Sequence, residues 1–194
     1  GAFFRPFRMP LPMNPDPACR RVSGAPYRFR PAAALLSAIL AGTPGAGGVA
    51  ADRLSPTLTI SGDIGHFTDP DSKTYTISLP SLASMPQRNI TTATDWTPKG
   101  TFSGPLLRDL LAKAGARGTQ VKFYGADDYS ITVPIADFSR YDVILAWRWN
   151  GKPLQLENYG PFWVMYPIPT MPSDETGGTF TSKLIWQVTR MEVR

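Results

Sequence analysis

The stretch NITTATDWTPKGTFSGPLLRDLLAKAGA, residues 89–116, combines threonine hydroxyls and a tryptophan with a helical pattern of leucines. Trp96 draws attention because the residues around it, TATDWTPKG, include no other large apolar side chain. Tryptophan is intermediate in burial statistics, so its setting matters more than its type. The pattern leaves two roles open for Trp96: it covers a ligand pocket, or it plugs the end of a sheet.

Few side chains are suited to metal binding or nucleophilic catalysis. Cys19 is the only cysteine and His66 the only histidine. A zinc or iron centre needs several such ligands, so we expect no metal centre and place His66 in a turn or at the surface. The same scarcity argues against Ser-His-Asp and Cys-His catalysis. The neighbouring Asp127 and Asp128 could do acid–base work, but acidic pairs in turns are commonly solvated.

The charge of the chain is concentrated at its N-terminal end. The formal net charge is +5, and residues 1–51 carry six arginines and one aspartate. Residues 52–194 carry 14 basic and 14 acidic side chains. Nucleic-acid binding depends on a basic surface, so this balanced composition argues against a nucleic-acid partner.

The first 51 residues have the pattern of an export signal. Arg28 and Arg30 precede the apolar run AAALLSAILAG, and the small residues up to Ala51 fit a cleavage site. The run is shorter than the roughly 20 residues of a membrane-spanning helix, although an uncleaved anchor is the alternative. We therefore expect a leader over residues 1–51, cleaved near Ala51, and a domain over residues 52–194 in the periplasm. That domain would contain no cysteine, which suits an oxidising compartment.

Alternating apolar residues and turn signals predict a protein rich in strands. One helix is clear: Ser103 is the expected N-cap, Pro105 lies near the first turn, and Gly115 is the expected stop. Leucines between the two recur at helical spacing and should face the core. Many strands with one clear helix predict an α+β domain with mixed or antiparallel sheets and few helices. The expected strands cover residues 57–64, the first part of 74–85, 120–125, 127–135, 141–154 up to a turn at Asn150-Gly151, 161–167 and 182–194. SLASMPQ, residues 81–87, is a candidate helical turn, and NITTATDW, residues 89–96, is expected to be extended.

The order of these segments resembles the molybdopterin-binding domain of the sulfite oxidase family. The resemblance covers roughly residues 74–194 and is carried by TFSGPLLRDLLAKAGA, VKFYGADDYSITVPI, YDVILAWRWNGKPL, GPFWVMYP and SKLIWQVTRMEV. It implies that the cysteine that holds molybdenum in the family corresponds to Thr92, with Trp96 four residues later. It also implies that Trp163 stands where the family has a phosphate-binding arginine.

These two departures favour a bare pterin over molybdopterin. A threonine hydroxyl stays protonated at neutral pH, unlike a thiolate of lowered pKa, and is a poor molybdenum ligand. Without the arginine, the bidentate grip on a phosphate is missing. A pterin ring is flat and neutral, and it needs an aromatic plate and hydrogen-bonding groups.

The chain is similar to a cysteine-free periplasmic branch of the family, the pterin-binding regulators. This resemblance implies a non-catalytic sensor whose liganded form acts on the periplasmic part of an inner-membrane cyclic-di-GMP signalling enzyme. The expected ligand-binding residues are Trp96 as stacking plate, Asp128 as acceptor, Tyr129 and Tyr159 as walls, Thr92 and Thr94 as hydroxyl groups, and Trp163.

Two alternatives stay open at this point. The chain could keep a molybdenum cofactor with an unusual ligand, as a molybdopterin-dependent oxidoreductase or an electron-transfer subunit. It could also be an adaptor that offers only a protein surface. Fold alone does not decide between these functions.

Overall fold

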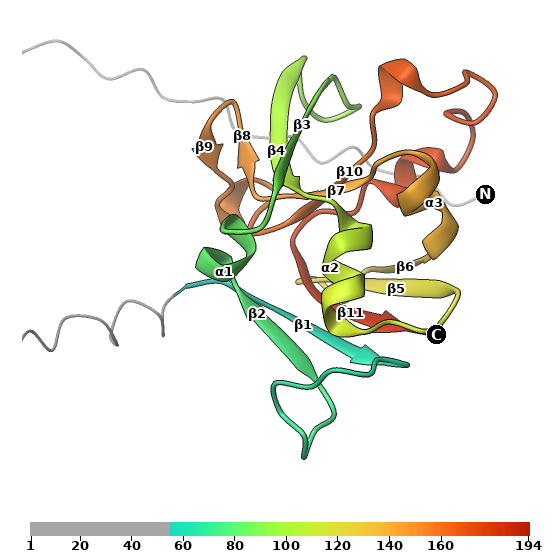
Figure 1. Ribbon diagram of the computed structural model, residues 1–194. Helices are drawn as coiled ribbons and strands as arrows, with labels where there is room; N and C mark the ends of the chain where they lie inside the picture. The colour runs from blue at the N-terminus through green and yellow to red at the C-terminus, as the bar shows by residue number, and fades with distance from the viewer. Residues whose placement is uncertain (1–54) are drawn as a thin grey trace, which may run out of the picture. The chain divides into compact units, whose positions relative to one another are not determined.

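The computed structural model describes residues 55–194, and the expected leader and its cleavage site near Ala51 lie outside this range. Within it, no helix is long and apolar enough to cross a membrane. Three sheets and short helices make up the described chain (Figure 1).

The largest sheet has five strands in the order β2-β1-β11-β5-β6. β1 and β11 run parallel, and the other neighbours run antiparallel, so the sheet is mixed. Its central strands alternate in burial because one face meets the core, as Leu58 and Ile60 show in β1. The strands are β1 (Thr57–Gly62), β2 (Tyr75–Ser78), β5 (Gln120–Gly125), β6 (Ser130–Pro134) and β11 (Val188–Val193).

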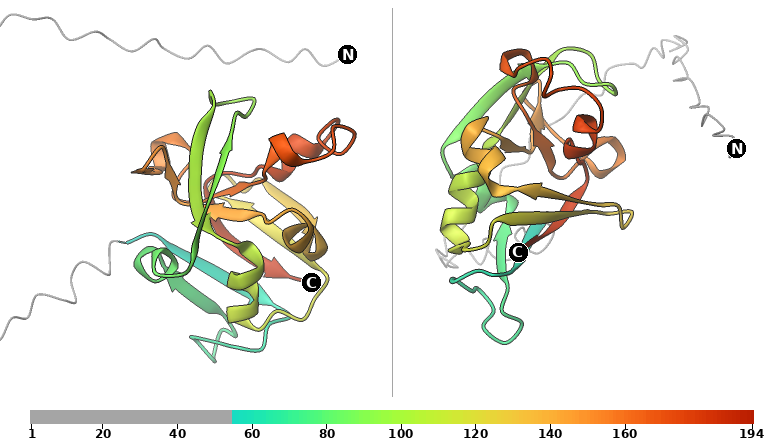
Figure 2. Two further views of the ribbon diagram at one scale, coloured as in Figure 1. Left: turned by 45° about the horizontal axis from the view of Figure 1, so that its top comes forward. Right: turned by 90° about the vertical axis from the view of Figure 1, so that its right-hand side faces the viewer.

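Two smaller sheets complete the domain. A four-stranded antiparallel sheet has the order β3-β4-β8-β9, with β3 at one edge, and β10 pairs with β7 in a buried ribbon. The β3–β4 hairpin projects beyond the five-stranded sheet, and residues 167–184 lie beside it (Figures 1 and 2). The strands are β3 (Gln87–Thr92), β4 (Gly100–Pro105), β7 (Ile144–Ala146), β8 (Arg148–Trp149), β9 (Lys152–Pro153) and β10 (Trp163–Met165).

The expected helix is α2 (Leu107–Ala114), and its C-terminal end is as predicted. Gly115 adopts φ 67° and closes the helix with bonds from its N–H to the carbonyls of the last turn. The predicted N-cap is wrong. Ser103 lies in β4, where its hydroxyl donates to Asn89 Oδ1 at 2.7 Å. The first helical N–H, that of Leu107, instead donates to the Val143 carbonyl at 2.9 Å.

Two other predicted elements are interrupted in the structure. The chain from residue 141 to the predicted turn at Asn150-Gly151 forms β7 and β8 rather than one strand, because it leaves the buried ribbon at Ala146 and joins the four-stranded sheet. The turn itself lies between β8 and β9, as predicted. Residues 182–194 form a strand only from Val188 onward. Gln187 has φ 52°, in the left-handed region, and this breaks the extended run.

Short helices connect the strands, and one core joins all three sheets. Besides α2 there are α1 (Leu79–Ala83) and α3 (Ile135–Arg140), and a 3-10 turn, η4, covers Phe180–Lys183. The buried face of α2 and the ribbon residues of β7 and β10 belong to the same apolar cluster. The α+β class with mixed sheets and few helices is confirmed.

Candidate ligand-binding site

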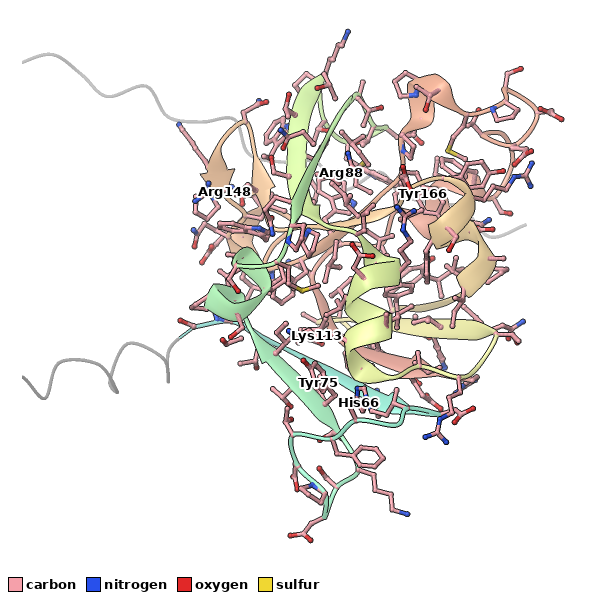
Figure 3. The ribbon with its side chains drawn as sticks, in the orientation of Figure 1. His66, Tyr75, Arg88, Lys113, Arg148 and Tyr166 are labelled. Atoms are coloured by element: carbon pink, nitrogen blue, oxygen red, sulfur yellow. The ribbon has the colours of Figure 1, made fainter. Side chains whose placement is uncertain are left out.

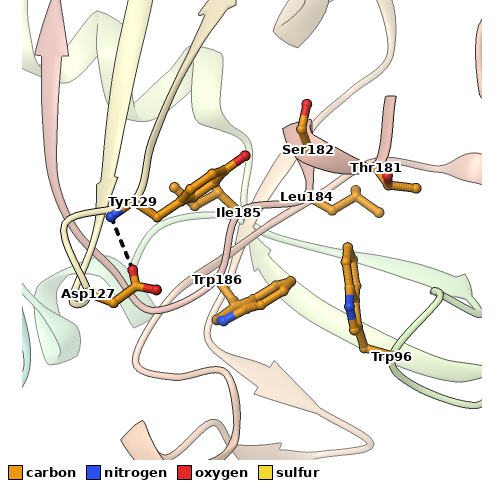
Figure 4. A pocket seen from close by; sticks show the side chains of 8 residues that line it. All are labelled: Trp96, Asp127, Tyr129, Thr181, Ser182, Leu184, Ile185 and Trp186. Carbon is orange, nitrogen blue, oxygen red and sulfur yellow. Dashed lines mark hydrogen bonds between the residues drawn. The ribbon is translucent and has the colours of Figure 1, made fainter. Parts of the chain in front are cut away.

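A cavity of about 280 Å³ lies beside the end of the β5–β6 hairpin and has walls rich in aromatic side chains (Figure 4). Its volume is near the lower end of the roughly 300–1,000 Å³ of small-molecule sites. Two other hollows, of about 480 and 540 Å³, are larger, but hydroxyls, amides and charged side chains make up much of their walls. The lining residues are Trp96, Asp127, Tyr129, Thr181, Ser182, Leu184, Ile185 and Trp186.

Trp96 and Trp186 form two adjoining walls of the cavity. Their ring centroids are 4.5 Å apart and their planes cross at 69°, an edge-to-face contact. Because the planes are not parallel, a flat ligand can stack on one ring and touch the other only at an angle. Trp96 remains 39% exposed, so it is available to a ligand. The structure therefore places Trp96 in a cavity wall, one of the two roles its sequence setting left open.

A threonine turn fixes the position of Trp96. The hydroxyl oxygen of Thr94 accepts from the N–H groups of Trp96 at 3.2 Å and Thr97 at 3.0 Å. The Tyr159 hydroxyl donates to the Trp96 carbonyl at 3.3 Å, across 63 residues of sequence. Thr94 and Tyr159 are not in the cavity wall. They hold the backbone that carries Trp96.

The carboxylate in the wall belongs to Asp127, and Asp128 is not among the lining residues. Oδ1 of Asp127 accepts from the Tyr129 N–H at 3.2 Å, shown as a dashed line in Figure 4. Gly125 N–H donates to the Tyr129 carbonyl at 2.8 Å and closes the tight turn, in which Asp128 has φ 63°. The Tyr129 ring lines the wall, as the sequence predicted, and is largely exposed.

Trp163 lies behind the cavity rather than in it. The side chain is fully buried, and its indole N–H donates to the Leu184 carbonyl at 2.9 Å. Its ring meets Tyr159 at 4.5 Å and Trp186 at 6.1 Å between centroids. Trp163 therefore supports Tyr159 and the wall from Thr181 to Trp186 from behind, and a ligand in the cavity would not contact it.

Thr92, the position that the resemblance matched to the metal-binding cysteine, is also buried. Thr92 is only 1% exposed, and its hydroxyl donates to the Ala93 carbonyl at 2.9 Å. A second cavity, of about 250 Å³, lies next to it between Ala93–Asp95 and residues 168–184. This second cavity includes Thr94, and it shares Thr181 and Leu184 with the aromatic cavity.

An ion pair beneath η4 ties the cavity wall to helix α3. Lys183 Nζ donates to Asp137 Oδ2 at 2.7 Å, and the Tyr166 hydroxyl donates to the same oxygen at 3.2 Å. Burial, followed by the charge of Asp137 and this hydrogen bond, raises the pKa of Tyr166 well above its ordinary value. Tyr166 therefore stays a neutral donor, and the network fixes the 3-10 turn that carries Thr181 and Ser182.

Sequence reasoning missed Asp127 as the lining carboxylate and the whole wall from Thr181 to Trp186. Trp186 was expected in the closing strand, where an aromatic residue normally serves the core. The nearest sequence signal is the stretch PIPTMPSDETGG, residues 167–178, whose length is typical of functional loops, but it ends before Thr181.

The residues that would have to hold molybdopterin do not fit its metal and phosphate. Thr92 offers a hydroxyl already committed to a backbone carbonyl, and the described residues contain no group of three His, Cys, Asp or Glu suited to a metal. The wall of the aromatic cavity contains no arginine or lysine and one carboxylate, Asp127. A phosphate dianion would meet repulsion there instead of a bidentate partner.

The fold is that of a molybdopterin-binding domain. Residues 64–170 match the sequence model of the family described as oxidoreductase molybdopterin binding domain, which is more than half of the chain. The chain belongs to this family. The matched range ends before the Thr181–Trp186 wall.

Among solved structures, the chain is similar to the sulfane dehydrogenase SoxCD from Paracoccus pantotrophus. The identity is 19%, the match covers 71% of this chain and 38% of that chain, and the TM-score is 0.54. The chain thus corresponds to well under half of the length of that relative, and the likeness concerns the fold. No curated protein matches this chain.

Proposed function

We propose that this protein binds a pterin ring in the aromatic cavity and acts as a non-catalytic sensor. The observation that carries the proposal is the conjunction of Trp96 and Trp186 with the Asp127 carboxylate in one cavity of about 280 Å³. Trp96 stacks on the ring, and Tyr129 lines the side of the cavity. Asp127 accepts from the ring's N–H and amino groups, a pair of parallel donors that one carboxylate can satisfy.

A pterin without metal and phosphate suits the cavity better than the complete cofactor of the family. The ring is neutral and flat, so it gains from aromatic stacking and needs no cationic side chain. Within the described chain Oδ2 of Asp127 has no partner, and Oδ1, which accepts from the Tyr129 N–H, has a second lone pair, so both oxygens can accept from the ring. Thr92 supports the same choice because its protonated hydroxyl cannot replace a thiolate.

The cellular role rests on the sequence and the resemblance. Arginines followed by an apolar run and small residues support export to the periplasm, with cleavage near Ala51. In our proposal the pterin-loaded protein then regulates the periplasmic part of an inner-membrane cyclic-di-GMP enzyme. Family membership favours a second candidate, a molybdopterin-dependent oxidoreductase.

Titration of the exported, purified protein with reduced neopterin separates these functions. We expect saturable quenching of tryptophan fluorescence with one ligand per chain and, in elemental analysis of the same sample, far less than one molybdenum per chain. Stoichiometric molybdenum would establish the oxidoreductase instead. Failure of reduced neopterin, biopterin and unsubstituted pterin to quench would refute pterin binding.

The adjacent carboxylates provide a matched pair for this titration. Asp127→Asn should raise the Kd for reduced neopterin at least tenfold, because a charge-assisted bond to the ring is lost while the Tyr129 N–H keeps its acceptor. Asp128→Asn should leave the Kd unchanged, since Asp128 is outside the wall and asparagine tolerates its positive φ. Equal effects of the two substitutions would contradict the assignment of Asp127.

A further inference from the structure

A separate groove of about 480 Å³ runs along β3 and is lined by three segments of the chain. β3 contributes Arg88 to Ile90, the end of α3 contributes Arg140 to Asp142, and the stretch after β10 contributes Pro167, Thr170 and Pro172. Figure 3 labels Arg88 on β3. None of these residues lines the aromatic cavity.

The groove follows the open edge of a sheet. β3 pairs with β4 on one side and with no strand of residues 55–194 on the other. Side chains alternate between the two faces of a strand, so three consecutive lining residues place the groove along the edge of β3 rather than on one face. Such an edge presents unpaired N–H and C=O groups and can accept a further strand. β3 has six residues, which corresponds to roughly 20 Å.

Positive charge is available at this edge. Arg88 makes no ion pair among the described residues, whereas Arg140 pairs with Glu175 at 2.6 Å. The one lining carboxylate, Asp142, is paired with Arg108. Among the charged lining residues of the described chain, Arg88 is therefore the one without an ion-pair partner, and its charge is positive.

Tyr141 also lines the groove, although its hydroxyl is buried and forms no hydrogen bond within the described chain. The guanidinium of Arg140 lies over the Tyr141 ring, 5.0 Å from its centroid, and fixes both side chains at the end of α3.

We propose that this groove receives an extended acidic segment of a partner protein, which adds to β3 as an outer strand. The backbone of the segment pairs with the edge of β3, and its carboxylates meet Arg88 and Arg140. An added strand can form hydrogen bonds along the whole edge of β3, whereas a small anion bound between two arginines would contact only part of it. The proposal does not depend on pterin binding.

The test uses a defined probe, the acetylated and amidated peptide Glu-Val-Asp-Val-Glu-Val, added to the ¹⁵N-labelled full chain without pterin. We expect saturable shifts of the amide signals of β3 and of Tyr141 at peptide concentrations up to about 1 mM, the weak end of specific binding. The same peptide N-methylated at every residue should not bind, because it has no backbone N–H left to pair with the edge of β3. A peptide with lysine in place of its acidic residues should not bind either.

Protein variants locate the contact. Arg88→Glu should weaken binding of the acidic peptide at least tenfold, whereas Arg148→Glu, at an exposed position of β8 in the same sheet, should leave it unchanged. Equal binding of the N-methylated or lysine peptide overturns the proposal, as does an absence of shifts in β3. Inorganic phosphate or succinate that produced the same shifts would replace it with a small-anion site. A loss of neopterin binding would leave this result untouched.

Discussion

Replacing Trp96 by alanine tests the stacking role most directly. The side chain is 39% exposed and contacts Trp186 edge-to-face, so it contributes little to the core and much to the cavity wall. Removing one aromatic plate that stacks on a flat heterocycle costs about 1–3 kcal/mol. The planes of Trp96 and Trp186 cross at 69°, so only one stacked face is lost rather than the two of a sandwich. The Kd for reduced neopterin should therefore rise about 5- to 150-fold.

The folded state should tolerate this change. The contact between the two rings is worth about 0.5–1.5 kcal/mol, which sets the expected loss in the free energy of unfolding. Thr94 and Tyr159 bind the backbone of residue 96, not its ring, so the turn should persist. Loss of affinity would then report on the ligand contact and not on unfolding.

Tryptophan fluorescence is altered by the substitution itself, so isothermal titration calorimetry is the better assay. Phe67→Ala is the matched control, because Phe67 is 42% exposed, aromatic and absent from the cavity wall. It should leave the Kd unchanged. If Trp96→Ala bound reduced neopterin as tightly as the unaltered protein, or if both variants lost affinity equally, the stacking argument would be refuted.

Three further predictions concern stability in urea. Gly104→Ala should lower the free energy of unfolding by at least about 2 kcal/mol or prevent folding, since the added Cβ would lie 2.0 Å from the Leu145 carbonyl oxygen. An unchanged urea midpoint would disprove this close approach. Lys183→Met should lower the free energy of unfolding by about 1–2 kcal/mol, because Asp137 loses its cation while both side chains are partly exposed. Lys183→Arg keeps the positive charge and should recover part of this loss. Hydrogen bonds from Arg194 and Tyr124 lower the pKa of Glu192 below its usual 4.5. That contribution to stability is present above the unfolded pKa and is lost as pH falls through the lower folded pKa. Below about pH 4.5 the free energy of unfolding of Glu192→Gln should therefore fall less steeply with pH than that of the unaltered protein. The same slope for both proteins would contradict this prediction.

Local patterns predicted much of the fold. The leucine spacing and Gly115 identified α2 and its end, because helix periodicity and a left-handed stop are local properties. Alternation identified β1 and β5, because each strand has one face toward the core. The N-cap at Ser103 failed because its hydroxyl and backbone belong to a sheet, and the helix start is satisfied by Val143, a residue 36 positions later in the chain than Leu107.

The candidate site was predicted only in part. Trp96 and Tyr129 lie in the cavity wall, but Tyr159 and Thr94 support it from outside. Nothing in the sequence distinguished Asp127 from Asp128, because the difference arises from a tight turn that directs only one of two adjacent carboxylates into the wall. Trp163 is buried for a different reason, its contacts with other segments of the chain such as the Leu184 carbonyl.

By itself, the sequence determined the chemistry that is available. Residues 52–194 contain no cysteine and one histidine, so none of these residues offers a thiolate to a metal near Thr92. Tertiary structure decided which groups lie together: Trp96 with Trp186 in one cavity, and Arg88 with Arg140 in the wall of one groove. The division has a physical reason, since composition and periodicity are properties of neighbouring residues. Cavities and edges arise where segments far apart in the chain pack together.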